Sequence, residues 1–459
     1  MIFDQYYLDC LSHASYLIAD EGTRRAVVVD PQRDISEYLA DAADKGLTIE
    51  LVLETHFHAD FLSGHLELAS ATGAEIGFSS VAEPEFEHRA LADGERISLG
   101  DVVLEIRHTP GHTPESMSIV VWEHEDDEAP YAVLTGDTLF VGDVGRPDLL
   151  SSFGVTREEL GEMLYESLHT KLLTLPDETR VYPAHGAGSA CGKNLSTDLW
   201  STIGEQRDTN YAIQAPDKAT FIEVVTEGQP PAPAYFVHDA VLNRQAHDLL
   251  GEEVVPDGLD WAEVQAHRAA GALLVDGRDP VDFARGHLAG AINVGLEGRY
   301  AEFAGSIVPA DVDIVLFVEP GTELEAKNRL GRIGFDRVVG YVEDPYGVLQ
   351  RHPGEVRQAS RLSPVDFEER RASLDDLQLI DVRNPGEVAL GTIPGAASIP
   401  VGQIPERVEE IDPDRPTVVY CAGGYRSSVA ASLLRERGVA DVSDILGGYG
   451  AWTTAIQPA

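Results

Sequence analysis

Cysteine is scarce in this chain of 459 residues. It has three cysteines, Cys10, Cys191 and Cys421, which lie far apart in the sequence. Three thiols cannot build the disulfide framework that stabilises many secreted proteins, so we expect a reducing compartment, the cytoplasm. The N-terminal segment Met1–Gln5 has neither the basic part nor the apolar part of a signal peptide, which agrees with that expectation.

Long apolar runs are also missing. Although 43% of the residues are hydrophobic, no stretch is both long enough and apolar enough to span a bilayer. The sequence therefore predicts no membrane partner.

Positive charge is scarce, and lysine most of all. The chain has five lysines, and its 34 basic residues face 78 acidic ones, which gives a formal net charge of −44. This charge repels a phosphate backbone, and no basic stripe with aromatic residues is present, so we predict no nucleic-acid partner. The acidic residues are scattered rather than clustered, which favours a halophilic protein over one that docks to a basic partner.

Four short polar strings in the first half of the chain each follow an apolar run. Runs such as 49–53, 102–106 and 131–134 read as buried strands, so the strings should lie where strands end and loops begin. Imidazoles and carboxylates that converge at such a rim can bind a first-row transition metal; the alternative is a set of polar residues that bond one another without an ion. The strings are Thr55–Asp60, Thr109–Thr113, Gly136–Thr138 and Pro183–Gly186.

These strings resemble the metallo-β-lactamase family, in which a His-x-His-x-Asp motif, a later His, a bridging Asp and a last His follow one another. The resemblance implies an αββα sandwich. In that family the first motif usually ends Asp-His, and the extra histidine helps to hold a second metal ion. Here Phe61 follows Asp60, and a phenyl ring cannot bind a metal. A two-zinc thioester hydrolase of the glyoxalase II class would therefore lack one of its ligands.

The missing ligand favours a centre with a single ion, held by His56, His112 and Asp137. Two histidines and one carboxylate are the ligands of non-haem Fe(II) oxygenases, which keep open positions for dioxygen and substrate. We therefore expect one Fe(II) per chain, with zinc as the alternative.

Two segments, 56–61 and 184–192, resemble the persulfide dioxygenase branch of the family, especially its fusions with rhodanese domains. By this resemblance, His58, Asp60 and His185 orient the ligands and bound water.

Two further residues are candidates for the substrate site. Arg146 could position an anionic substrate, or it could form a structural ion pair with Asp148 in the same turn. Cys191, six residues after His185, could be a regulatory or relay thiol, or a passive residue of a tightly packed loop.

A cysteine loop lies near the C-terminus, between the apolar run 416–420 and an alanine-rich segment, 429–437, that we expect to be a helix. The loop runs from Cys421 to Arg426. Its backbone N–H groups and the positive end of the helix can surround an anionic sulfur, although a buried structural cysteine is the alternative. The loop is one residue shorter than its phosphatase counterpart, which suits a sulfane sulfur better than a phosphate. The other loop residues that we expect to contribute are Ala422, Gly423, Gly424, Tyr425 and Ser427.

Together with Asp381–Arg383, Glu387 and Gly391–Ala396, this loop resembles a rhodanese domain. Thr392 departs from the family, which commonly has histidine there, and we expect it to affect loop packing more than chemistry.

A second copy of the pattern lies upstream, over 273–278 and 286–294. Its strand 313–317 runs into Val318–Gly321 with no cysteine, so this copy cannot form a persulfide. The resemblance therefore implies two rhodanese-like α/β domains with parallel sheets, of which only the second carries the reactive thiol.

We predict three domains from these patterns: residues 1–250 for the metal domain, 255–356 for the silent rhodanese-like domain and 362–459 for the active one. The boundaries are suggested by Gly228–Pro233, Val255–Gly258 and Arg351–Pro364.

The function implied by the resemblance has two steps. A low-molecular-weight thiol persulfide is oxidised with dioxygen to sulfite and thiol at the iron, and Cys421 carries sulfane sulfur between thiosulfate, sulfite and a thiol. We also expect a homo-oligomer. The alternatives are a two-zinc thioester hydrolase with an appended sulfurtransferase domain, and a non-catalytic sulfur-binding protein.

Overall fold

The computed structural model describes residues 1–149, 154–229 and 231–456. The chain forms two compact units, Met1–Ala232 with Phe236–Leu250, and Pro233–Tyr235 with Gly251–Ala459. Residue 230, in the predicted boundary 228–233, and residues 457–459, at the predicted end of the last domain, lie outside the described residues. Among the helices that the structure describes, none has the length and apolar character needed to cross a membrane.

The first unit contains two six-stranded sheets. In the first sheet the antiparallel strands β1–β3 are followed by the parallel strands β4–β6. Its strands are β1 (Ile2–Leu8), β2 (His13–Ala19), β3 (Arg25–Val29), β4 (Thr48–Leu53), β5 (Glu75–Ser79) and β6 (Arg89–Leu91). The second sheet, in the order β12-β11-β10-β9-β8-β7, has β7 (Arg96–Ser98), β8 (Val103–His108), β9 (Met117–Trp122), β10 (Ala132–Gly136), β11 (Arg180–Pro183) and β12 (Ser201–Thr202).

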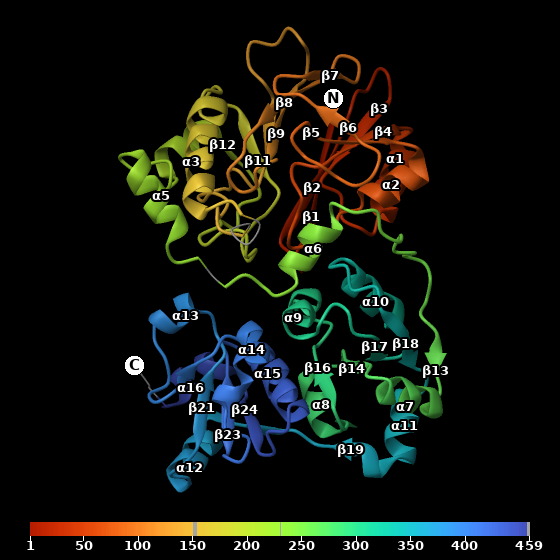
Figure 1. Ribbon diagram of the computed structural model, residues 1–459, viewed down its shortest axis with the longest axis vertical. Coiled ribbons are helices and arrows are strands. Elements are labelled where there is room, and N and C mark those ends of the chain that lie inside the picture. The colour runs from red at the N-terminus through yellow and green to blue at the C-terminus, as the bar shows by residue number, and fades with distance from the viewer. Residues whose placement is uncertain (150–153, 230, 457–459) are drawn as a thin grey trace. The chain divides into compact units, whose positions relative to one another are not determined.

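The two sheets pack face to face, and helices cover their outer faces (Figure 1). A core that includes Tyr16, Val27, Leu104 and Leu134 lies between the sheets. Helices α1 (Ser36–Lys45) and α2 (His65–Thr72) bury their apolar sides against the first sheet, and α3 (Arg157–Ser167) and α5 (Lys218–Thr226) against the second. Helix α4 (Ile203–Thr209), helix α6 (Phe236–Leu242) and a π-helical turn (Leu168–Leu172) complete the unit. The predicted αββα sandwich is confirmed.

The predicted strand ends are confirmed as well. Strands β4, β8, β10 and β11 end at Leu53, His108, Gly136 and Pro183, so each polar string begins at or just after a strand end. Strands β10 and β11 are parallel neighbours, which brings their carboxyl ends to the same edge of the sheet.

The second unit contains two five-stranded parallel sheets with the same strand order, as duplicated domains would have. The first, in the order β13-β18-β17-β14-β16, has β13 (Gly258–Leu259), β14 (Leu273–Asp276), β16 (Ala291–Asn293), β17 (Ile314–Phe317) and β18 (Val338–Val342). Its helices are α7 (Trp261–Ala269), α8 (Pro280–Arg285), α9 (Tyr300–Ile307), α10 (Glu323–Gly331) and α11 (Pro345–Arg351). A small pair, β15 (His287–Leu288) with β19 (Val356–Arg357), closes this half.

The second of these sheets, in the order β20-β24-β23-β21-β22, has β20 (Ser360–Leu362), β21 (Gln378–Asp381), β22 (Ala397–Ser398), β23 (Thr417–Tyr420) and β24 (Val442–Ile445). Its helices are α12 (Pro364–Ser373), α13 (Pro385–Ala389), α14 (Ile404–Arg407), α15 (Tyr425–Glu436) and α16 (Gly448–Ile456). The two predicted α/β domains with parallel sheets are confirmed.

Helix α15 begins earlier than the sequence suggested. We predicted a helix over 429–437, but the helix starts at Tyr425 because Gly424, at φ 103°, turns the chain directly from the loop into the first helical turn. Arg426 and Ser427 are therefore in the first turn of the helix, beside Cys421.

Candidate metal centre and cysteine loop

Three buried side chains from three different strings face one another in the first unit. The Nε2 atoms of His56 and His112 lie 3.8 and 3.5 Å from Oδ2 of Asp137. The three residues are at most 2% exposed, and their ligand atoms all lie within 4.8 Å of one another. The predicted ligand set is thus brought together around one point.

The other ring nitrogen of each histidine is anchored. Nδ1 of His112 lies 2.9 Å from the carbonyl oxygen of Arg146, which can only accept, so this nitrogen carries the proton. Nδ1 of His56 lies 3.0 Å from Oγ1 of Thr55, whose hydroxyl donates to Asp30 and therefore accepts from the imidazole. Both rings consequently direct an unprotonated Nε2 towards Asp137, as metal-binding histidines do.

The electrostatics of the group suit a cation. Burial, followed by the neighbouring imidazoles of His58 and His112, lowers the pKa of His56 well below its usual value. Burial also lowers the pKa of His112. Although burial opposes it, the His185 imidazole lowers the pKa of Asp137. Two neutral imidazoles and one carboxylate are the protonation states in which these groups bind a metal.

Two buried polar atoms of this group have no hydrogen-bond partner among the described residues. Within the parts of the chain that the structure describes, His56 Nε2 and Asp137 Oδ2 are buried and make no hydrogen bond. A buried polar atom left in this way is costly, and an ion at the meeting point would satisfy both atoms. The residues present therefore fit a bound metal ion.

His185 lies between two carboxylates beside this group. Its Nδ1 is 2.7 Å from Oδ1 of Asp137, and its Nε2 is 2.8 Å from Oδ2 of Asp60. Burial opposes protonation, but the carboxylates of Asp137 and Asp60 raise the pKa of His185 well above its usual value. Both nitrogens of His185 are thus donors in this arrangement.

The cysteine loop lies in the second unit, between β23 and α15. The backbone N–H of Gly424 donates to Sγ of Cys421 at 3.0 Å, and the Ser427 hydroxyl lies 3.7 Å from that sulfur. Arg426 makes a double ion pair with Glu387, at 2.6 and 2.8 Å. The loop therefore gives the sulfur a backbone donor, as a site for an anionic sulfur requires, while the thiol itself donates to the Ser427 hydroxyl.

The comparisons with known proteins agree with this geometry. A family model for the metallo-beta-lactamase superfamily matches residues 8–185, and a model for the rhodanese-like domain matches residues 260–344 and 363–455. A crystal structure described as a metallo-beta-lactamase from Staphylococcus aureus is 32% identical, with a TM-score of 0.67, and the match covers 74% of this chain and 98% of that one.

The chain belongs to the metallo-β-lactamase superfamily and carries two rhodanese-like domains. Within the superfamily, the metal domain is 32% identical over 173 residues to the mitochondrial persulfide dioxygenase ETHE1 of Bos taurus, covering 37% of this chain and 63% of that protein. It is 33% identical over 177 residues to a hydroxyacylglutathione hydrolase-like protein of Mus musculus, covering 37% of this chain and 56% of that protein. The chain thus spans less than two thirds of the length of each of these relatives.

Position 61 of the metallo-β-lactamase domain holds a buried phenyl ring that packs against two histidines. The Phe61 ring is 1% exposed, and its centroid lies 3.9 Å from that of His13 and 4.3 Å from that of His58. His13 was not predicted as a site residue, because it precedes the motif by more than forty positions and stands alone in the sequence.

A buried acidic pair beside His58 was also missed. Nε2 of His58 lies 3.1 Å from Oδ1 of Asp30 and 3.6 Å from Oε2 of Glu54. One nitrogen of His58 therefore faces the acidic pair, a geometry consistent with the predicted orienting role. Asp30 directly follows the apolar strand β3, as the recognised strings follow theirs, and this signal could have found it.

The two tentative substrate residues are near the metal group. The Arg146 side chain forms a double hydrogen bond with Asp148, at 2.7 and 2.8 Å, which is the structural alternative that we considered. Cys191 is 1% exposed, and its sulfur lies within 4.8 Å of ligand atoms of Asp137 and His185. Burial, with the carboxylates of Asp60 and Asp137, raises the pKa of the Cys191 thiol well above its usual value. The thiol is therefore not a ready nucleophile in this state.

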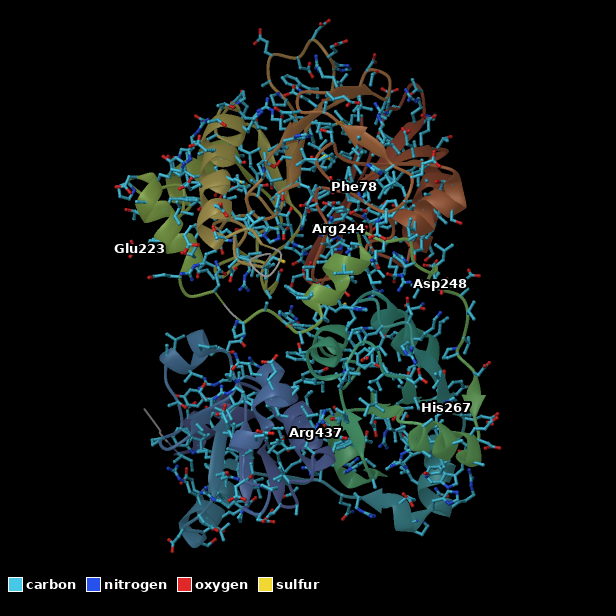
Figure 2. The ribbon with its side chains drawn as sticks, viewed as in Figure 1. Phe78, Glu223, Arg244, Asp248, His267 and Arg437 are labelled. Atoms are coloured by element: carbon cyan, nitrogen blue, oxygen red, sulfur yellow. The ribbon has the colours of Figure 1, made fainter. Side chains whose placement is uncertain are left out.

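A cavity of about 200 Å³ borders Phe57, the residue between His56 and His58. Its lining includes Phe57, Ala82, Pro114, Glu115 and Arg244. Figure 2 labels Phe78 and Arg244, both of which contact Phe57: the two phenyl centroids are 4.9 Å apart, and the guanidinium carbon lies 5.3 Å from the Phe57 ring. The cavity thus combines apolar walls with one cation and one carboxylate.

Proposed function

We propose that this protein is an iron-dependent persulfide dioxygenase with a sulfurtransferase domain. The metallo-β-lactamase domain would oxidise a low-molecular-weight thiol persulfide to sulfite and thiol, and Cys421 would transfer sulfane sulfur. The observation that carries the proposal is the convergence of His56, His112 and Asp137 at one buried point, next to a position, 61, that offers no ligand.

The surroundings of this group support a single ion over a two-zinc cluster. A second ion would have to use the neighbouring group His58, Asp60 and His185, whose ligand atoms also lie within 4.8 Å of one another. A metal ligand must be an unprotonated nitrogen, but His185 is engaged by Asp60 and Asp137 through both nitrogens. Phe61 occupies the remaining position with an apolar ring packed on His13. Two histidines and one carboxylate are the ligand set typical of Fe(II) oxygenases.

Fe(II) held by His56, His112 and Asp137 would supply the dioxygen chemistry. The chain's own residues would set its surroundings. Asp60 and Asp137 hold a proton on His185, so one carboxylate oxygen of Asp137 is neutralised by a hydrogen bond while the other stays free for the ion. Burial of the whole group excludes water that would compete with the substrate.

The cavity beside Phe57 is the proposed place for the thiol carrier of the substrate. Its apolar wall would take the carbon chain of the carrier, and Arg244 would pair with a carboxylate on it. Glu115 accepts a hydrogen bond from the backbone N–H of Phe57 at 3.1 Å, which fixes this wall relative to His56 and His58.

The sulfurtransferase step is proposed to use the Cys421 loop. The Cys421 thiolate attacks the outer sulfur of thiosulfate, a new S–S bond forms, and the electron pair of the old S–S bond leaves with sulfite. A second thiolate then takes the outer sulfur, which restores Cys421 and yields a new persulfide. The Gly424 N–H and the Arg426 guanidinium would stabilise the anionic sulfur in between.

Metal content and oxygen uptake test the first activity. We expect a single iron per chain and oxygen consumption when a thiol persulfide is added to the iron-loaded protein. His112→Ala should lose both, because two remaining ligands hold ferrous iron poorly, whereas the exposed His124→Ala should lose neither. Two zinc ions per chain, or no oxygen uptake by the iron-loaded protein, would overturn the proposal and favour the thioester hydrolase.

A cysteine variant separates the two activities. Cys421→Ser should abolish transfer of sulfur from thiosulfate to a thiol and leave oxygen uptake unchanged, while Cys10→Ser, at a half-buried site, should leave both unchanged. Loss of both activities in Cys421→Ser would show that the two sites do not act separately.

A further inference from the structure

A second cavity, of about 420 Å³, lies in the second unit between its two rhodanese-like halves. The silent domain contributes β15, the start of β16 and β19, and the active domain contributes β20, the C-terminal end of α15 and the turn that follows it. The cavity is lined by two guanidinium groups, an imidazole and two hydroxyls, those of Arg357, Arg435, His287, Ser360 and Ser432.

The cations of this cavity lack carboxylate partners, which is unusual in a chain with 78 acidic and 34 basic residues. Within the described parts of the chain, Arg357, Arg435 and His287 form no salt bridge, and the side chains of Arg357 and Arg435 donate hydrogen bonds to backbone carbonyls alone. Burial and the guanidinium groups of Arg435 and Arg357 contribute to lowering the pKa of His287 to about 4, so the positive potential of the arginines reaches the imidazole.

The two acidic residues that line the cavity are already engaged. Glu436 pairs with Arg437 at 3.1 Å, and Asp441 pairs with Arg370 at 2.6 Å. Figure 2 labels Arg437, which directly follows the last residue of α15. Neither partner arginine lines the cavity, so the acidic residues are neutralised from outside. Asp444, which pairs with Arg361, attracts Arg435 from beyond ion-pair distance, and the two arginines of the cavity form no ion pair in the described parts of the chain.

We propose that this cavity binds a tetrahedral oxyanion, either free phosphate or a sulfur oxyanion, or the phosphate of a larger metabolite. Guanidinium groups present paired N–H donors that match such an anion, and Ser360, whose hydroxyl accepts from Ser443, adds a hydroxyl donor. The volume is several times that of one small ion, so the anionic group of a larger molecule also fits.

The site is separate from the cysteine loop. Cys421 lies beside the N-terminal end of α15, whereas Arg435 is ten residues further along the helix, a distance of about 15 Å at the usual rise per residue. An anion held at Arg435 therefore does not contact the reacting sulfur. The helix joins the two places, because its Ser432 hydroxyl accepts from the backbone N–H of Asn293 at the edge of the cavity.

Histidine NMR of the full-length protein tests the site directly. The ring signals of His287, assigned by their loss in His287→Gln, should shift when inorganic phosphate or sulfate is added at constant ionic strength with chloride as the balancing ion. An alkyl phosphate monoester forms the second arm of the experiment. Tighter binding of the ester than of phosphate would identify a larger metabolite as the occupant, and equal or weaker binding would identify the free ion.

Two arginine variants decide the outcome. Arg357→Gln, at an exposed position, and Arg435→Gln should each weaken the binding roughly tenfold or more, since each removes a charged hydrogen-bond donor. Arg407→Gln, whose guanidinium pairs with Glu410, removes the same charge elsewhere in this domain and should leave the binding unchanged. Absence of a His287 shift with every anion, or unchanged affinity in Arg357→Gln, would overturn the proposal.

Discussion

At the scale of single residues, the proposed single-ion centre rests on position 61. The Phe61 ring occupies the space between His13 and His58, with the His185 ring centroid 6.3 Å away. An apolar ring there both withholds a ligand and leaves His185 to be held by its two carboxylates. In the proposed function, the choice between a single ion and a pair of ions thus depends on one side chain.

Replacement of this ring by a ligand gives the first prediction. Phe61→His should raise the metal content from a single ion to about two per chain, because an imidazole would join Asp60 and His185 at the second position. Elemental analysis of the purified variant after zinc loading measures the change. Phe61→Leu, which changes the shape without adding a ligand, is the control and should keep a single ion. An unchanged metal content in Phe61→His would mean that the missing ligand does not determine the stoichiometry.

His65 gives a prediction about pH and stability. Burial, followed by the neighbouring His247 and His58, lowers the pKa of His65 from 6.5 to about 3. Between these two pH values the unfolded chain binds a proton at His65 that the folded chain does not. The contribution of neutral His65 to the free energy of unfolding is therefore complete above pH 6.5 and is lost as the pH drops towards 3. His65→Phe can stack on Phe86 as the imidazole does, and it has no proton to bind.

Urea unfolding of the metal-free protein at a series of pH values between about 7 and 4 measures this loss of stability. The wild type should lose more stability than His65→Phe over that range, while the exposed His124→Phe should follow the wild type. Parallel curves for the wild type and His65→Phe would contradict the assignment.

The sequence predicted the metal group better than its surroundings. His56, His112 and Asp137 could be found because each stands in a polar string after an apolar strand, and such strands place their ends at one rim. Glu54 and His13 were missed because their contacts depend on the side-by-side order of β2, β3 and β4, which the spacing along the chain does not reveal. Asp30 follows the apolar strand β3 and carried a signal that was overlooked. The double hydrogen bond from Arg146 to Asp148 could be offered only as one of two possibilities, since both residues of the turn were charged.

At the scale of secondary-structure elements, β16 of the silent domain packs against α15 of the active one. The Asn293 side chain accepts from the Ser428 hydroxyl at 2.8 Å, and the Tyr425 hydroxyl donates to the carbonyl oxygen of Gly295 at 2.6 Å. Gly298 has to be a glycine, because a Cβ there would lie 2.4 Å from the Tyr425 ring. The domain without a cysteine therefore holds the first turn of the helix on which the cysteine loop depends.

This contact predicts a role for Tyr425 in positioning the loop. Tyr425→Phe removes one buried hydrogen bond and should lower the sulfurtransferase rate by roughly fivefold, with oxygen uptake unchanged. Rates of sulfur transfer from thiosulfate to a thiol measure the effect. Tyr346→Phe removes a tyrosine hydrogen bond to Glu319 at an exposed site in the same unit and should leave the rate unchanged. Equal rates in the wild type and Tyr425→Phe would limit the silent domain to a scaffold without influence on the loop.

The strands were predicted correctly from the sequence, but the start of one helix was not. The apolar runs predicted the strands, but the start of α15 was placed four residues late, at 429 rather than 425. The loop residues Tyr425–Ser428 carry aromatic, charged and hydroxyl side chains, which do not favour a helix strongly by themselves. They are helical because Gly424 turns the chain and because Tyr425 and Ser428 find partners in the silent domain, contacts that local propensity cannot supply.

At the scale of the whole molecule, charge is the dominant feature. The net charge of −44 is spread over a chain that still buries extensive apolar cores in both units. Repulsion among surface carboxylates opposes the compact state at low ionic strength, because the screening length is then about 10 Å. At about 1 M salt the screening length falls to about 3 Å, shorter than most distances between surface charges.

The last prediction follows from this screening. The free energy of unfolding should rise steadily as KCl is increased from about 0.1 M to about 2 M, and most of the gain should come at the low end, where the screening length changes most. Urea unfolding at each salt concentration measures it. Sucrose at matched osmolality leaves the charges unscreened, so it separates screening from exclusion of solute, and it should not reproduce the early, steep part of the rise. A stability that is flat between the lowest salt concentrations would mean that the acidic side chains are compensated locally, by ion pairs such as those of Glu387 and Asp441, rather than by the ions of the solvent.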